Sequence, residues 1–186
     1  MIRAATKFFA CAALIGLSAC QQQEPGLRTG FASFNARTFC IDPDGSPGAG
    51  LALLHCAEDL GQAWRLTPAG TADGRTLFTL ASTSNDLCVE TPDTIGQRVR
   101  LEPCAARASQ QMSIDAFNTA PSTGAFNSAA VEADTDLTRY AGIIFHAAGR
   151  QGCVAVAGEE LTLQPCVDPA SGRFNAQAEW ALFAGP

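Results

Sequence analysis

The feature that most constrains this chain is a cysteine pair that occurs three times in the same local context. The two cysteines are separated by 15 residues in the first and second copies and by 12 residues in the third. The pairs are Cys40 and Cys56, Cys88 and Cys104, and Cys153 and Cys166. We expect each first cysteine to form a disulfide with its downstream neighbour. A unit this small cannot bury its own apolar face, so three copies predict a fold with internal threefold repetition.

The residues around each second cysteine also repeat. Apolar residues stand five and three positions before it, as Leu51 and Leu53, Val99 and Leu101, and Leu161 and Leu163. A further phrase follows at Gln62-Ala63-Trp64, Gln110-Gln111-Met112 and Ala178-Glu179-Trp180. This shared context makes a chance scatter of six cysteines improbable. We expect Trp64, Met112 and Trp180 to pack in the core, where large apolar side chains are usually found.

The N-terminal residues 1–19 read as an export signal. Arg3 and Lys7 precede an apolar run at 8–17, which is too short to span a bilayer as a mature helix. The run ends in Leu17-Ser18-Ala19-Cys20, which resembles a bacterial lipoprotein lipobox, and this resemblance implies cleavage before Cys20 and lipidation of Cys20. The alternative is an ordinary secretory signal that leaves Cys20 as a free thiol.

Lipidation would place the protein in the bacterial cell envelope. Several acyl chains on one residue hold a protein on a membrane almost permanently, because each buried methylene contributes roughly 0.8 kcal/mol. Gln21 follows the anchor, and the lipoprotein sorting rule then favours the outer membrane. Whether the domain faces the periplasm or the exterior stays open. Disulfides agree with an oxidising compartment.

The charge of the chain restricts its partners. Removing residues 1–19 takes away two positive charges and no negative ones, so the formal net charge changes from -6 to -8. An acidic chain of this kind argues against nucleic-acid binding, which needs a positive face to displace counterions. It argues equally against electrostatic docking on anionic lipid. We therefore expect contact with the membrane only through the N-terminal lipid.

Strand signals dominate the rest of the chain. Short alternating or β-branched segments recur at 76–81, 98–101, 141–146, 161–163 and 179–183, and turn clusters such as 42–48 and 68–74 separate them. Many short strands with regular turns predict an all-β sandwich or barrel. The second and third copies lie farther apart than the first and second, so we assign residues 118–139 to a loop insertion. Such a long segment is either functional or a disordered excursion.

Cys-x-Asp, Leu-x-Leu-x-x-Cys and Gln-x-Trp, repeated three times, resemble the ricin B-type β-trefoil lectins. The first copy fits best, with Cys40-Ile41-Asp42, Cys56 and Gln62-Ala63-Trp64. The resemblance implies a β-trefoil, in which three four-stranded copies build a six-stranded barrel with a cap of three hairpins. It covers residues 34–183. We divide the chain into a signal peptide at 1–19, an anchor and linker at 20–33, and a trefoil at 34–186, with copies at about 34–75, 76–117 and 140–186.

The third copy is also similar to the C subunit of cytolethal distending toxin. The similar phrases are Leu163-Gln164-Pro165-Cys166, Ser171-Gly172-Arg173-Phe174 and Ala178-Glu179-Trp180-Ala181-Leu182. Phe78-Thr79-Leu80, Asp86-Leu87-Cys88-Val89-Glu90 and Gln151-Gly152-Cys153-Val154 are similar to segments of the A and C subunits. Those subunits are trefoils without chemistry of their own that deliver a nuclease subunit. The resemblance implies a protein partner, for which a secreted nuclease is one candidate.

The lectin resemblance also implies where a sugar would bind. Lectins of this family hold a hexose between a carboxylate and an aromatic ring. Asp42 occupies the carboxylate position in the first copy, Glu90 in the second, and Ala155 in the third. The position of the ring is filled by Leu54 or His55 in the first copy, and Gln62 is its motif glutamine. Asp42, Gln62, His55 and Glu90 are therefore the candidate ligand-binding residues, although Asp42-Pro43-Asp44-Gly45 is also strong turn chemistry by itself.

Catalysis has little support in the sequence. His55 and His146 are the only histidines, and His146 sits in a strand-like run that favours a structural or edge role. Once the cysteines are paired, no metal-binding spacing is left, and no phosphate loop or nucleophile elbow occurs. We therefore assign no catalytic residues, metal or cofactor. Two functions stay open: a lipid-anchored trefoil that binds another protein, and a carbohydrate-binding surface lipoprotein. A purely structural envelope protein is the remaining alternative.

Overall fold

The computed structural model describes residues 27–42, 44–56, 63–123, 128–149 and 152–183. The elements are β1 (Leu27–Ser33), β2 (Ala36–Ile41), β3 (Leu53–His55), β4 (Trp64–Ala72), β5 (Arg75–Ser82), β6 (Leu87–Glu90), β7 (Arg100–Pro103), η2 (Ala108–Gln110), β8 (Met112–Phe117), η3 (Pro121–Thr123), β9 (Ser128–Ala130), η4 (Leu137–Arg139), β10 (Gly142–Ala147), β11 (Gly152–Ala157), β12 (Glu160–Pro165), η5 (Ala176–Ala178) and β13 (Trp180–Phe183). The signal peptide at 1–19, Cys20 and Gln62 lie outside the described residues. In the part of the chain that is described, no helix has the length and apolar character needed to cross a membrane.

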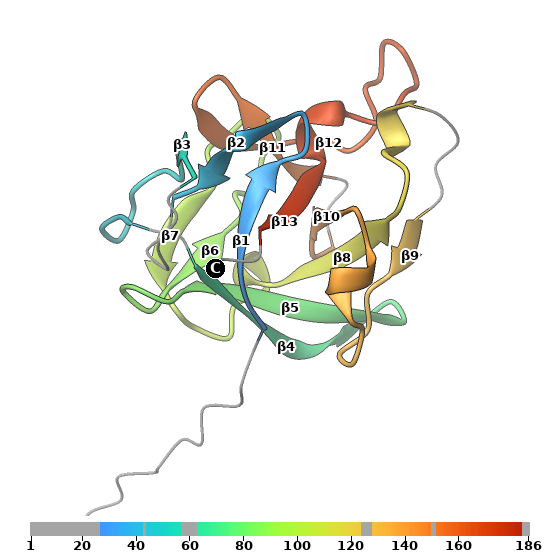
Figure 1. Cartoon of the computed structure of the whole chain (residues 1–186). Helices are drawn as coiled ribbons and strands as arrows, with labels where there is room; N and C mark the ends of the chain where they lie inside the picture. Colours follow the sequence, from blue (N-terminus) through green and yellow to red (C-terminus); the bar gives the residue numbers. More distant parts are fainter. Residues whose placement is uncertain (1–26, 43, 57–62, 124–127, 150–151, 184–186) are drawn as a thin grey trace, which may run out of the picture.

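Six of the described strands close into a barrel. Its antiparallel neighbours run in the order β1, β4, β5, β8, β10 and β13, and β13 pairs with β1 again. Three further pairs, β2 with β3, β6 with β7 and β11 with β12, form hairpins (Figure 1). Each copy therefore supplies two barrel strands and the hairpin between them. This arrangement is a β-trefoil and confirms the predicted all-β fold.

The hairpins meet in a ring of backbone hydrogen bonds around the pseudo-threefold axis. The N–H of Leu51 donates to Val99 O at 3.0 Å, that of Val99 to Leu161 O at 2.9 Å, and that of Leu161 to Leu51 O at 3.0 Å. All three side chains are buried. These are the residues that stand five positions before the second cysteine of each copy. The repeated phrase therefore marks the place where the three copies join.

The three predicted disulfides are present and confirm the predicted pairing. They join Cys40 to Cys56, Cys88 to Cys104, and Cys153 to Cys166. Each one ties the first strand of a hairpin to the segment that follows the second strand. A crosslink over 13 to 16 residues removes conformations from the unfolded chain and stabilises the fold by roughly 3 kcal/mol.

The barrel is filled by large side chains from all three copies. Phe31, Trp64, Met112, Phe145 and Trp180 are all buried, as predicted for the motif residues at 64, 112 and 180. The indole Nε1 of Trp64 donates to Ile41 O at 3.2 Å, and that of Trp180 donates to Val154 O at 3.0 Å. A buried N–H needs such a partner. The two tryptophans thereby fix the hairpin of their own copy to the barrel.

The start of the domain differs from the prediction. Leu27–Ser33, which we assigned to the linker, forms β1 and pairs with both β4 and β13. This strand closes the barrel against the far end of the chain, so no local pattern marks it. A second difference concerns the turn cluster at 68–74, because β4 continues to Ala72. Pro68 lies beside a bulge in the pairing with β5, where a missing N–H is tolerated.

The insertion at 118–139 packs against the barrel over its described residues, 118–123 and 128–139. Its strand β9 pairs with the end of β8, as Figure 1 shows. Val131 and Leu137 are buried and join the main core. The described part of the insertion is therefore an ordered element that packs against β8 and the main core, and not a disordered excursion.

Candidate binding sites

The second copy keeps the carboxylate arrangement that the lectin resemblance implies. Glu90 ends β6, and its Oε2 accepts hydrogen bonds from Gln110 Nε2 at 3.1 Å and Arg107 Nη1 at 3.2 Å. Gln110 is fully buried and also bonds Pro103 O at 3.0 Å and the N–H of Ala105 at 2.7 Å. The motif glutamine of this copy therefore holds the Glu90 carboxylate in one orientation.

Glu90 opens into a polar cleft of about 630 Å³. Asp93, Gln97 and Arg100 line the same cleft, and Glu102 stands where the resemblance places the aromatic ring. None of the described residues that line it is aromatic. The cleft offers hydrogen bonds and charge to a ligand but no surface on which a sugar ring can stack.

In the first copy, Asp42 serves the local turn. Its Oδ1 accepts the N–H of Asp44 at 3.0 Å. The Asp44 carboxylate in turn accepts a hydrogen bond from Ser84 Oγ at 2.8 Å, and Asn85 Nδ2 donates to Gly45 O at 3.1 Å. The turn therefore ties the first copy to the second. The sugar-contact roles of Asp42 and of Gln62, which is outside the described residues, stay predictions.

His55 lies in a different cavity from Asp42. Its ring packs on Phe39 with the centroids 4.6 Å apart. Together with Leu53, Leu54 and Val156 these residues line a cavity of about 690 Å³. Val156 belongs to β11, so the cavity lies between the first and third copies. Asp42 is not among its lining residues, and the structure does not bring the two candidates together in one cavity.

The third copy has lost the polar positions of the sugar site. Ala155 replaces the carboxylate, and Ala178 replaces the motif glutamine; both side chains are fully buried. The neighbouring Glu179 is also fully buried and accepts hydrogen bonds from the Ser122 N–H at 2.7 Å and from Ser122 Oγ at 3.0 Å. The Glu179 carboxylate therefore fastens the insertion to the barrel.

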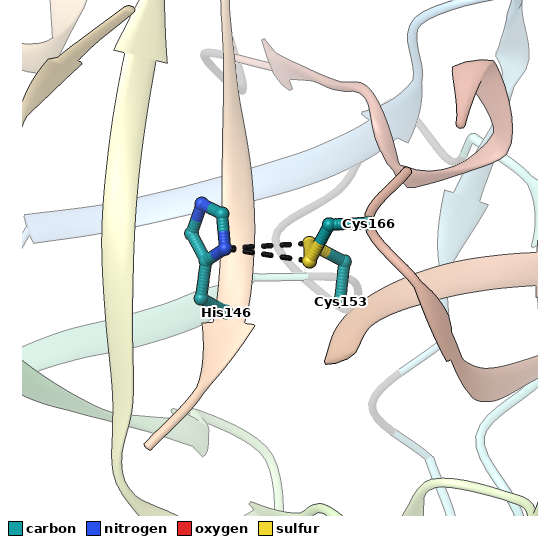
Figure 2. A group of neighbouring side chains, drawn as sticks. All are labelled: His146, Cys153 and Cys166. Carbon is teal, nitrogen blue, oxygen red and sulfur yellow. Dashed lines mark hydrogen bonds between the residues drawn. A yellow bond between two sulfur atoms is a disulfide. The ribbon is translucent and has the colours of Figure 1, made fainter. Parts of the chain in front are cut away.

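His146 belongs to a cluster that the sequence analysis did not find. Strand pairing sets His146 opposite Cys153, and its Nδ1 lies 3.4 Å from Cys153 Sγ and 3.5 Å from Cys166 Sγ (Figure 2). Its Nε2 donates to Asp115 Oδ2 at 3.0 Å. The imidazole and the two sulfurs are close enough to share an ion, but the sulfurs are bonded to each other and are not thiolate ligands.

Asp115 connects His146 to Arg75. One carboxylate oxygen bonds Arg75 Nη2 and the other bonds His146, and only 9% of the Asp115 side chain is exposed. Burial by itself raises the pKa of the Asp115 carboxyl, but the hydrogen bond and charge of His146, together with Arg75, outweigh burial and lower the pKa below its ordinary value. The lowered pKa keeps the Asp115 carboxylate charged between Arg75 and His146.

These residues line an outer cavity of about 570 Å³. The other walls come from η3 of the insertion and from the segment after β12, and they include Pro121, Val167, Arg173 and Phe174. Arg75, Asp115, His146 and Arg173 are far apart in the sequence. The one signal for this site is that positions 75, 115 and 146 lie near the ends of barrel strands. Identifying it requires the register between those strands.

Searches against models of protein families and against curated protein sequences give no match. Solved structures are similar to the chain. A designed threefold-symmetric protein, ThreeFoil, matches 84% of the chain and 98% of its own length with a TM-score of 0.59 and 12% identity. A chain of cytolethal distending toxin from Actinobacillus actinomycetemcomitans matches 88% and 94%, with a TM-score of 0.56 and 14% identity. The β-trefoil lectin of Vibrio vulnificus hemolysin, solved with N-acetyl-D-lactosamine, matches 86% and 95%, with a TM-score of 0.52 and 13% identity.

Proposed function

We propose that this protein is a lipid-anchored, non-catalytic binding protein whose trefoil recognises another protein. The scaffold is a trefoil like that of the toxin chain and of the hemolysin lectin, which was solved with N-acetyl-D-lactosamine bound. Low identity means that the similarity supports the fold, while the role rests on the surface of this chain. A subunit that delivers or assembles with a secreted nuclease is the form of this function that the toxin similarity suggests.

The observation that carries the proposal is the apolar cavity of the first copy. Phe39 is 36% exposed and Leu54 is 50% exposed, and both line this cavity beside Leu53 and Val156. Large apolar side chains exposed together at a concave surface are typical of protein interfaces, where one anchor side chain fills such a pocket. The ring of His55 packs against Phe39 with the two planes tilted by 31°. The cavity lies beside the β2–β3 hairpin of the first copy, and Asp42 is not among its lining residues.

Affinity capture from envelope extracts tests this function. The purified protein, with its disulfides intact, should retain a partner in stoichiometric amount, and Leu54→Asp should reduce the yield at least about tenfold because a buried carboxylate without a partner is unfavourable. Ile95→Asp is a matched control, since Ile95 is exposed to a similar extent, 44%, and does not line the first-copy cavity. A monomer alone in every fraction, or equal loss with both variants, would contradict the proposal.

The anchor is the second part of the proposal. Residues 1–26 are outside the described part, so support comes from the sequence Leu17-Ser18-Ala19-Cys20. Mass spectrometry of the N-terminal peptide should find a diacylglyceryl group on Cys20, and Cys20→Ser should release the protein from the membrane fraction. An unmodified Cys20 thiol would remove the anchor and the outer-membrane location with it.

Carbohydrate binding is the second candidate, because Gln110 and Arg107 hold Glu90 in a cleft. A glycan array with the purified protein decides it. If the second copy binds a sugar, Glu90→Gln should weaken the signal at least about tenfold, since charged hydrogen bonds are strong. Asp134→Asn, which removes a charge in the insertion, should leave it unchanged, and Asp42→Ala tests the first copy. Absence of binding at millimolar sugar would exclude this function.

A further inference from the structure

The third copy differs from the other two at one position of the barrel. The first cysteine of each disulfide pairs with one residue of the preceding barrel strand. This residue is Ala32 in the first copy, Ala81 in the second, and His146 in the third. Alanine at these positions leaves the disulfide packed against a methyl group. His146 instead brings a titratable ring to the same place. The departure from threefold symmetry is therefore local and adds a functional group where the scaffold does not need one.

Two segments cover this part of the barrel and enclose a cavity beside His146. The outer face of the third copy carries a second apolar cluster that includes Phe117, Ile144 and Cys153. The insertion covers one side of it through η3, and the 166–174 segment covers the other side. Among the described residues, the second copy has neither element. The outer cavity lies where these two segments meet the ends of β5, β8 and β10.

The outer cavity is cationic although the protein is acidic. Its lining carries the guanidinium groups of Arg75 and Arg173 and the imidazole of His146 against one carboxylate, Asp115. Among the described residues, Arg173 has no ion-pair partner, and its side chain is exposed. The buried Nε of Arg75 also has no hydrogen-bond partner among them. A buried donor without an acceptor is unfavourable.

We propose that the outer cavity binds the carboxylate of an acidic peptide segment on the protein partner, with an apolar side chain next to that carboxylate. This inference rests on the proposed protein-binding function and adds a second contact to it. Arg173 is the primary charge for the ligand. Asp115 acts as an internal competitor, because it already occupies a donor of Arg75 and the Nε2 of His146.

The lining favours a peptide over an acidic sugar. Pro121, Val167 and Phe174 form its apolar walls, and Val167 is 50% exposed. The hydroxyl of Ser122 already donates to Glu179. A sugar would bring several hydroxyl groups into this cavity with few partners for them, and unpaired hydroxyls are costly to bury. An aliphatic or aromatic side chain would instead cover the apolar walls while the carboxylate reaches the arginine.

The charged groups around His146 come from each element packed against it. They are Asp115 from β8, Arg75 from β5 and Arg173 from the segment after β12, while β11 contributes only the neutral disulfide. Two more carboxylates, Glu132 and Glu179, are held by Thr76 and Ser122. The exposed guanidinium of Arg173 is therefore the charge that a ligand carboxylate meets first.

The test is a titration of the ¹⁵N-labelled protein, with disulfides intact, with the peptide acetyl-Phe-Glu-Leu-amide at pH 7. We expect shifts of the amide signals of the 166–174 segment and at least about tenfold weaker binding of acetyl-Phe-Gln-Leu-amide, since one charged contact is lost. Glucuronate and N-acetylneuraminate are run in parallel. Equal binding of the two peptides, or binding of the sugars without the peptide, would overturn the inference.

Variants of Arg173 and Asp115, with Arg139→Ala as a control, separate an effect on binding from an effect on folding. Arg173→Ala should weaken the acidic peptide about tenfold, while Arg139→Ala, which removes an exposed arginine from the insertion, should not. Asp115→Asn should tighten binding severalfold, because the competitor is gone; weaker binding in a folded Asp115→Asn protein would contradict the inference. If peptide binding fails while Leu54→Asp still abolishes partner capture, this inference is wrong and the proposed function stands. If the peptide binds but no partner is captured, the proposed function fails.

Discussion

The second and third copies of the repeat share one scaffold but place their polar side chains on different surfaces. In the second copy, Gln110 and Arg107 hold Glu90 at the rim of a cleft beside its hairpin. In the third copy, the equivalent positions are Ala155 and Ala178, and its titratable side chain His146 lies instead on the outer side of the barrel, where it meets Arg75 and Asp115 of the second copy. Both copies keep the disulfide and the buried residue at the position of the motif tryptophan, Met112 or Trp180. Both also take part in the ring of backbone hydrogen bonds that joins the hairpins.

This comparison shows which parts of the repeat are free to change. Residues that fill the barrel or join the hairpins serve all three copies at once, so changing one disturbs the whole core. Residues on the cleft rim contact their own copy, and the outer cavity joins Arg75 and Asp115 of the second copy to His146 of the third, so neither set fills the shared core. Function can therefore diverge between copies while the fold stays symmetric. We therefore expect the copies to be similar in their contribution to stability and to differ in their surface groups.

The largest expected effect is on the disulfides and tests whether the copies are equivalent. Replacing Cys88 and Cys104 by alanine, or Cys153 and Cys166 by alanine, should each lower the free energy of unfolding by about 3 kcal/mol, because the closed loops are of similar length. Urea denaturation followed by tryptophan fluorescence measures this. A difference above about 1 kcal/mol would show that one copy relies on its crosslink more than the other.

The next effect separates the two copies. Asp115→Asn should lower the free energy of unfolding by about 2 kcal/mol, because it leaves Arg75 and His146 facing each other in a partly buried site. Glu90→Gln should cost less than about 1 kcal/mol, since the Arg107 side chain is 54% exposed and such surface pairs are weak. Thermal and urea unfolding of both variants compare them. Equal losses in the free energy of unfolding would mean that the Asp115 carboxylate stabilises the fold no more than the exposed Glu90–Arg107 pair does.

The lowered pKa of Asp115 predicts that its contribution to the free energy of unfolding depends on pH. Because the folded-state pKa of Asp115 is lowered, its contribution is present in full above the ordinary carboxyl pKa of about 3.9 and is lost as the pH falls through the lower folded value. The difference in stability between the wild type and Asp115→Asn should therefore be largest at neutral pH and shrink below pH 4. A difference that stays constant from pH 7 to pH 2.5 would contradict this assignment.

The smallest expected effect concerns the chemistry of the third disulfide. A cationic imidazole next to a sulfur stabilises the thiolate that leaves during thiol exchange. His146→Gln should therefore slow reduction of Cys153–Cys166 by dithiothreitol a few-fold at pH 6. The Cys40–Cys56 and Cys88–Cys104 disulfides, whose opposite residues are Ala32 and Ala81, provide internal controls. Timed alkylation and peptide mass spectrometry give the rates; an unchanged rate at Cys153–Cys166 would show that the contact has no effect on exchange.

Part of the candidate sites was predictable from spacing within one copy. Glu90 stands two residues after Cys88, and its contact with Gln110 follows from the position of the motif glutamine after Cys104. Asp42 occupies the same position, but the turn at 42–44 uses its carboxylate, a role that the turn sequence itself predicted as the alternative. His55 was identified by its offset from Cys56. Its contact with Phe39 depends on the pairing of β2 with β3.

The outer cavity was beyond sequence reasoning. Arg75, Asp115, His146 and Arg173 come from four separate segments, and their meeting depends on how β5 pairs with β8 and how β8 pairs with β10. A shift of one residue in either register would turn a side chain to the opposite face of the sheet. The same reason hid β1, whose partner β13 lies at the other end of the domain.

The amino-acid sequence alone determined the threefold repeat, the three disulfides and the core position of Trp64, Met112 and Trp180, because these depend on local spacing and on apolar side chains that recur in each copy. The tertiary structure alone decided the closing strand, the packed insertion and the convergence of charged groups on His146. Contacts between copies depend on strand register over long separations, and a pattern of nearby residues carries no information about that register.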